Sequence, residues 1–109
     1  FQEYFKKKTK RLYQIKHSQR LLGVFPIEYQ PMTLKFDRGD LLYLYSDGLV
    51  DTFNPEETRF GYLRLSSILR KPHIGDLSEF ISDIIIKLKR FKKDRPWSDD
   101  TSFMVIRKK

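Results

Sequence analysis

The apolar run Leu41–Tyr45 constrains the fold of this chain more than any other segment. Five consecutive apolar residues stand between Asp40 and the polar turn residues Ser46-Asp47-Gly48. A short continuous run of this kind is typical of a strand that is covered on both faces, whereas a half-exposed strand alternates. The segment therefore predicts a layered domain in which this strand is deeply buried.

Three other segments have the composition of strands. Residues 4–16 are basic but β-compatible, and they predict one or two exposed strands joined by a turn near Lys8-Thr9-Lys10. Residues 32–36 alternate in polarity, so we expect a strand that forms a hairpin with Leu41–Tyr45. The hairpin turn would be residues 37–40. Residues 102–107 predict a final strand.

Helices are expected between the buried strand and the last one. Asn54-Pro55-Glu56-Glu57 has the pattern of a helix start, with an Asn cap, proline at the first position and acids in the first turn. A second helix is expected over residues 62–69. Apolar residues at three- and four-residue steps predict a third over residues 77–91. Strands, helices and a strand in this order predict an α+β layered domain.

The composition limits the kinds of protein this chain can be. A chain of 109 residues with 39% hydrophobic residues can form one domain with its own core. It contains no Cys, which excludes disulfides, thiol catalysis and Cys-rich metal sites and is expected of a cytoplasmic protein. No apolar run approaches the roughly 18 residues that cross a bilayer, although a membrane anchor elsewhere in a longer parent chain stays open.

The net charge of +8 is unevenly distributed. Two windows are basic: residues 1–20 hold seven Lys/Arg and one acid, and residues 87–95 hold six Lys/Arg and one acid. Residues 37–60, in contrast, hold six acids and two Lys/Arg. No helix-turn-helix, zinc finger or RNA-recognition signature accompanies the basic runs, so we expect no nucleic acid partner. The lysine runs are either solvated faces or contacts with an acidic partner or membrane surface.

Two acidic turns could bind a cation. Asp47 directly follows the buried strand, and Asp99-Asp100 directly precedes the last strand. If these strands are neighbours, both turns lie at one edge of the sheet. Carboxylate oxygens are the ligands that Mg²⁺ and Mn²⁺ prefer. The spacing alone leaves the alternative open that each Asp is only a turn or capping residue.

Residues 39–51, GDLLYLYSDGLVD, resemble the G-D-x-L-x-L-Y-[ST]-D-G-[LV]-x-[ED] signature of SpoIIE-like phosphatases. These form a branch of the metal-dependent (type 2C, PPM) serine/threonine protein phosphatases. Three further features follow the order found in the family: Leu22-Gly23-Val24 before Tyr29, Phe60-Gly61 followed by Leu63 and Leu65, and Asp99-Asp100-Thr101-Ser102.

The resemblance implies an α-β-β-α sandwich, in which two antiparallel sheets are flanked by helices, with a two-metal centre of Mg²⁺ or Mn²⁺ at one edge. Asp47 and Asp99 would be metal ligands. Asp100 would support the turn, and Gly48 would give the backbone room beside the ions. In the family, a metal-bridging water attacks the phosphorus of phosphoserine or phosphothreonine.

Two features of the family are missing from this chain. These are the G-D-x-x-D stretch, whose acids bridge the metals, and an A-G-H segment. Residues 1–109 are therefore expected to be the C-terminal portion of one phosphatase domain whose N-terminal half is absent. This portion is expected to be inactive on its own.

The resemblance implies a phosphorylated bacterial regulatory protein as substrate, for example an anti-sigma-factor antagonist, and an upstream sensor domain in the parent chain. The exposed edge of an incomplete sheet would allow self-association. The alternative is a degenerate phosphatase-like domain that acts as a binding or signalling module.

Overall fold

The structure is a computed structural model that describes residues 2–15, 33–71 and 75–109. Its elements in chain order are β1 (Gln2–Lys6), β2 (Arg11–Gln14), β3 (Leu41–Tyr45), α1 (Asp47–Val50), α2 (Gly61–Leu69), α3 (Leu77–Lys92) and β4 (Phe103–Arg107). The fold is α+β, as expected. Within the described residues no helix is long and apolar enough to cross a membrane.

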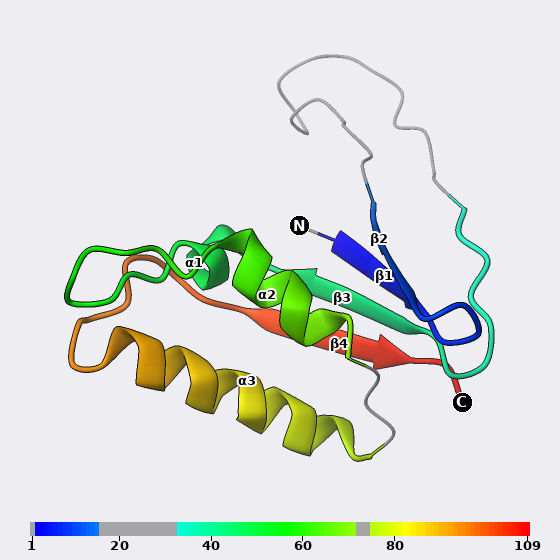
Figure 1. Cartoon of the computed structure of the whole chain (residues 1–109). Helices are drawn as coiled ribbons and strands as arrows, with labels where there is room; N and C mark the ends of the chain where they lie inside the picture. Colours follow the sequence, from blue (N-terminus) through cyan, green and yellow to red (C-terminus); the bar gives the residue numbers. More distant parts are fainter. Residues whose placement is uncertain (1, 16–32, 72–74) are drawn as a thin grey trace, which may run out of the picture.

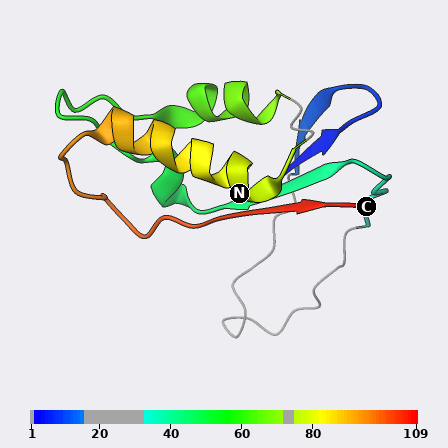
Figure 2. The same cartoon turned by 90° about the horizontal axis from the view of Figure 1, so that it is seen from below.

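The strands form one antiparallel sheet in the order β2-β1-β3-β4. Both long helices lie on one face of this sheet (Figures 1 and 2). β3 is an inner strand between β1 and β4, and three of its five residues are buried. The predicted strand at residues 41–45 is therefore confirmed, and its side chains are buried on the face that the helices cover.

Helix α3 has the boundaries and the inward face that its sequence predicts. The Asp76 carboxylate accepts a hydrogen bond from the Ser78 amide (3.0 Å) and so caps the first turn. Phe80, Ile84 and Leu88 recur at four-residue steps and are buried against the sheet and α2. Basic residues in the last turn favour the helix because its C-terminal end carries a partial negative charge.

Tyr43 lies at the centre of the core. Its side chain is fully buried, its ring lies 6.0 Å from that of Phe80 and 6.1 Å from that of Phe103, and its hydroxyl donates to the Leu69 carbonyl (3.2 Å). One residue of β3 thus contacts α2, α3 and β4. Burial strongly raises the pKa of this phenol, so it stays a neutral donor.

The opposite face of the sheet is apolar and no described helix covers it. Leu42 pairs with Ile106 and Leu44 pairs with Met104, so these four side chains share that face. Met104 is 56% exposed and Ile106 41%. The second sheet of the sandwich that the resemblance implies would pack on this face.

Two predicted strands differ from the structure. Residues 33–36 form no strand, because both edges of β3 are already hydrogen-bonded to β1 and β4. Their Phe36 ring instead packs beside Tyr4, 5.8 Å between centroids. The hairpin at residues 2–14 forms with its turn where expected, but β1 is buried rather than exposed because it lies between β2 and β3. Residue 32 lies outside the described residues.

The expected helix start at Asn54 is wrong. The Glu57 amide donates to the Asn54 carbonyl (3.0 Å), and the Asn54 side chain accepts from the Thr58 amide (2.7 Å). These bonds close a turn, and an isolated bridge joins Phe53 to Arg59. Asn and Pro favour turns as strongly as helix starts, and here the turn is formed. The next predicted helix, over residues 62–69, is confirmed as α2, which begins at Gly61.

A carboxylate lies buried beneath the helices. Glu3 is fully buried; the Tyr45 hydroxyl donates to its Oε1 (3.2 Å), and Oε2 has no hydrogen-bond partner among the described residues. Burial raises the pKa of Glu3 above its ordinary 4.5, and the hydroxyls of Tyr62 and Tyr45 offset this only in part.

Glu3→Gln should therefore stabilise the protein relative to the wild type at neutral pH and less so in acid. Above pH 4.5 the native state holds the Glu3 proton more tightly than the unfolded chain, so the free energy of unfolding falls as pH rises toward the raised pKa. Urea denaturation of both proteins at about pH 4 and about pH 8 measures this difference. An equal increase in the free energy of unfolding at both pH values would contradict a raised pKa for Glu3.

Candidate metal centre

Asp47 is placed by the end of the central strand. It follows β3 after Ser46 and is the first residue of the short helix α1, which the sequence did not predict. The Asp51 amide closes the turn by donating to the Asp47 carbonyl (2.9 Å). The Asp47 side chain is exposed, whereas the next three residues are buried. The carboxylate is thus held at the surface by an anchored backbone.

Asp99 and Asp100 lie at the same end of the sheet. β4 runs antiparallel to β3, Phe103 at its start pairs with Tyr45 at the end of β3, and the Ser46 amide donates to the Ser102 carbonyl (3.1 Å). The expectation that these two strands are neighbours is confirmed. Acidic turns 52 positions apart in sequence therefore meet at one edge.

Ser46 connects the two acidic turns. Its Oγ donates to the Asp100 carbonyl (3.1 Å) and accepts from the Ser102 amide (2.9 Å). Two hydrogen bonds from one hydroxyl fix the 99–102 turn relative to the start of α1. No local sequence pattern predicts this role, because the hydrogen-bond partners lie more than 50 positions away.

Gly48 is required by the close approach of these turns. A Cβ built at this position would clash with the Asp100 carbonyl oxygen and would contact the Thr101 hydroxyl. The neighbour that needs the space is thus the backbone of the second acidic turn. The predicted role of Gly48 beside metal ions stays a prediction.

The carboxylates of these turns are not neutralised by neighbouring cations. Within residues 2–15, 33–71 and 75–109, no Lys or Arg forms an ion pair with Asp47, Asp99 or Asp100. Asp51, four positions after Asp47, does pair with Arg59. One Asp99 oxygen accepts from the Asp100 amide (2.7 Å), which orients that side chain.

The donor set suits a hard cation but is incomplete. Exposed carboxylates without competing cations are suitable ligands for Mg²⁺ or Mn²⁺. However, nowhere in the described part of the chain do three or more His, Cys, Asp or Glu side chains gather where they could hold a metal. Asp47 and Asp99 can therefore supply part of a metal site, and further ligands would have to come from elsewhere.

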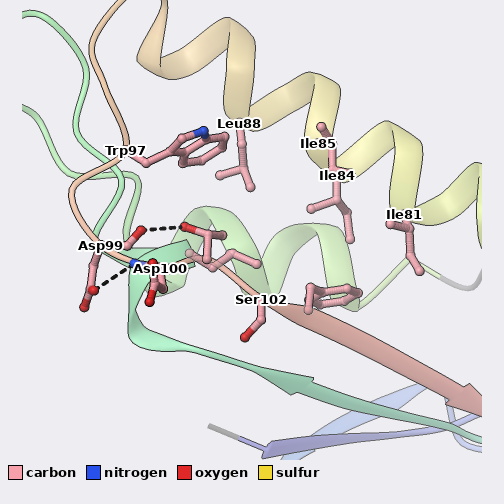
Figure 3. Close-up of a pocket in the computed structure, with 11 residues that line it drawn as sticks. Ile81, Ile84, Ile85, Leu88, Trp97, Asp99, Asp100 and Ser102 are labelled. Atoms are coloured by element: carbon pink, nitrogen blue, oxygen red, sulfur yellow. Dashed lines mark hydrogen bonds between the residues drawn. The ribbon is translucent and has the colours of Figure 1, made fainter.

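A cavity of about 580 Å³ lies beside the second acidic turn. Figure 3 shows Ile81, Ile84, Ile85 and Leu88 of α3 along one wall and Asp99, Asp100 and Ser102 along the other. Trp97 stands at one end and is 41% exposed, with the Lys92 ammonium 4.9 Å from its ring centroid.

Several sequence features lie outside the described residues. These are Leu22-Gly23-Val24 and Tyr29. The Phe60-Gly61 pair and the two leucines that follow form the start of α2, with Phe60 and Leu65 in the core.

The family described as Stage II sporulation protein E (SpoIIE) matches residues 3–109. The chain belongs to the SpoIIE family. A solved structure, the SiaA-PP2C domain of Pseudomonas aeruginosa, superposes with a TM-score of 0.80 at 20% identity, covering 97% of this chain and 42% of that one. No curated protein sequence matches the chain.

Family and fold together identify a phosphatase-type domain. At 20% identity the SiaA-PP2C likeness establishes the fold, and SpoIIE membership rests on a match over residues 3–109. The chain spans less than half the length of its structural neighbour, 42%.

Gly48→Ala tests the contact between the acidic turns. Alanine favours a helix over glycine by about 1 kcal/mol, so an uncrowded site would be stabilised. The clash with the Asp100 carbonyl should instead destabilise the protein by about 1–3 kcal/mol. Urea denaturation measures the change, and a neutral or stabilising result would show that the turns do not touch.

Proposed function

We propose that the complete domain to which this chain contributes is a metal-dependent serine/threonine protein phosphatase. The observation that carries the proposal is the meeting of Asp47 and the Asp99-Asp100 turn at one edge of the sheet, joined through Ser46. SpoIIE membership supports the same reaction class.

Asp47 and Asp99 would hold Mg²⁺ or Mn²⁺, together with acids from outside the described residues. Such ions polarise a phosphoryl group and make a bound water nucleophilic near neutral pH. Asp100 would shape the turn through its amide and carbonyl, which bond to Asp99 and Ser46. Gly48 would let the two turns approach.

The proposed substrate is a phosphoserine or phosphothreonine of a bacterial regulatory protein, for which an anti-sigma-factor antagonist is the example that the family suggests. We also propose an upstream sensor domain in the parent chain. The outer strands β2 and β4 are the edges at which self-association would occur.

A second candidate function is a binding module with the phosphatase fold and no catalysis. The observation that favours it is the lack of a third metal-ligating side chain beside Asp47 and Asp99 in the described part of the chain. This candidate predicts no hydrolysis by the complete parent and partner binding that does not depend on either carboxylate.

Asp47→Asn and Asp99→Asn, each made in the complete parent protein, should lower kcat/KM for a phosphoserine protein in Mn²⁺ by at least about 100-fold. An amide keeps the shape of the side chain but weakens its bond to a divalent ion. Phosphate release measures the rate, and melting temperature reports the fold.

Asp83→Asn serves as the matched control, because Asp83 is an exposed acid on α3 that lines no part of the cavity. Its activity should equal that of the wild type. Full activity in either site variant would contradict the proposed phosphatase site, and an inactive parent that still binds its partner would establish the binding module.

A further inference from the structure

The end of the sheet opposite the acidic turns gathers basic residues from three segments. The β1–β2 turn lies there, since Lys6 pairs with Arg11. The loop before β3 and the end of β4 join it, because the Gly39 amide donates to the Lys108 carbonyl (2.8 Å) and the Lys108 amide to the Asp40 carbonyl (3.2 Å). Figure 1 shows this hairpin turn and the C-terminus at the same end of the sheet.

Eight cations are exposed at this end, which we call the basic end. They are Lys7, Lys8, Lys10, Arg11, Lys35, Arg38, Lys108 and Lys109. The two acids of the loop before β3 are already engaged: Asp37 pairs with Lys6 (2.7 Å), and buried Asp40 accepts from the Tyr4 hydroxyl and the Lys7 amide. None of the eight forms an ion pair within the described residues.

The other basic run of the chain is different. Lys93 and Arg95, after α3, lie 4.0 and 3.6 Å from Glu56 and Glu57. These two cations are paired with acids of the 54–58 turn, whereas Lys87, Lys89 and Arg90 of α3 are exposed and form no ion pair within the described residues. The basic end differs in that it gathers unpaired cations from three chain segments, and their mutual repulsion is relieved when an anionic surface approaches.

The shape of the basic end favours a flat partner. It consists of turns and a strand end, and of its eight cations only Lys35 lines a described cavity. Six of the eight are Lys, which acts as a hydrated point charge, whereas Arg is the residue suited to bidentate recognition of one group. Tyr13 and Leu34, 44% and 38% exposed, lie beside Lys35 at that cavity and could enter a headgroup layer.

We propose that the basic end binds the surface of a bilayer rich in anionic phospholipid. Lysines near such a surface attract it individually and without specific geometry. The acidic turns at the far end of the sheet would be repelled by the same surface, so the protein would be oriented with Asp47 and Asp99 directed away from the membrane. This inference does not depend on the phosphatase proposal.

Flotation of the purified protein with lipid vesicles tests whether the basic end binds an anionic bilayer. The protein should float with vesicles of phosphatidylcholine containing about 30% phosphatidylglycerol, remain unbound with phosphatidylcholine alone, and be released at about 0.5 M NaCl. The double variant Lys8→Gln/Lys108→Gln removes one charge from each of two segments. It should partition about 30-fold more weakly into the anionic vesicles.

Lys89→Gln/Arg90→Gln is the matched control, since it removes the same charge from two exposed positions of α3. It should change partitioning less than about threefold if location matters rather than net charge. Equal losses in both variants, or no flotation of the wild type, would overturn the proposal. So would preference for a DNA duplex or for polyglutamate over the vesicles.

Discussion

The antiparallel pairing of β3 and β4 is the contact on which the rest of this structure depends. It continues past the last strand pair, because Ser46 bonds to both Ser102 and Asp100. The same pairing places Phe103 against Tyr43, so the core and the acidic edge are fixed by one strand register. A register slip of one residue would turn Tyr43 out of the core and separate the turns.

The molecule has two chemically distinct ends. Exposed carboxylates gather where β3 ends and β4 begins, and exposed cations gather where β1 turns into β2. Chain segments far apart in sequence contribute to each end, so neither follows from a local run of charge. The proposed metal site and the proposed membrane-binding surface thus lie at opposite ends of one small sheet and share no residues.

The sequence was informative where one physical pattern dominated. The apolar run at 41–45 and the apolar periodicity of 77–91 identified β3 and α3 almost to the residue, and the two Asp turns identified the acidic edge once β3 and β4 were neighbours. Sequence reasoning failed where partners are distant. No local sequence pattern predicts that β1 pairs with β3, which excludes residues 33–36 from the sheet. The same holds for the hydrogen bond from Ser46 to the Asp100 carbonyl.

The central claim is that folding brings Asp47 and Asp99 to one divalent-ion site. Paramagnetic broadening of backbone amide resonances by Mn²⁺ tests this most directly, because the effect falls steeply with distance from the ion. At low Mn²⁺ the amides of residues 47–49 and 99–101 should broaden together and recover in the Asp47→Asn/Asp99→Asn double variant. Broadening of one turn without the other, or of both turns unchanged in that variant, would contradict the account.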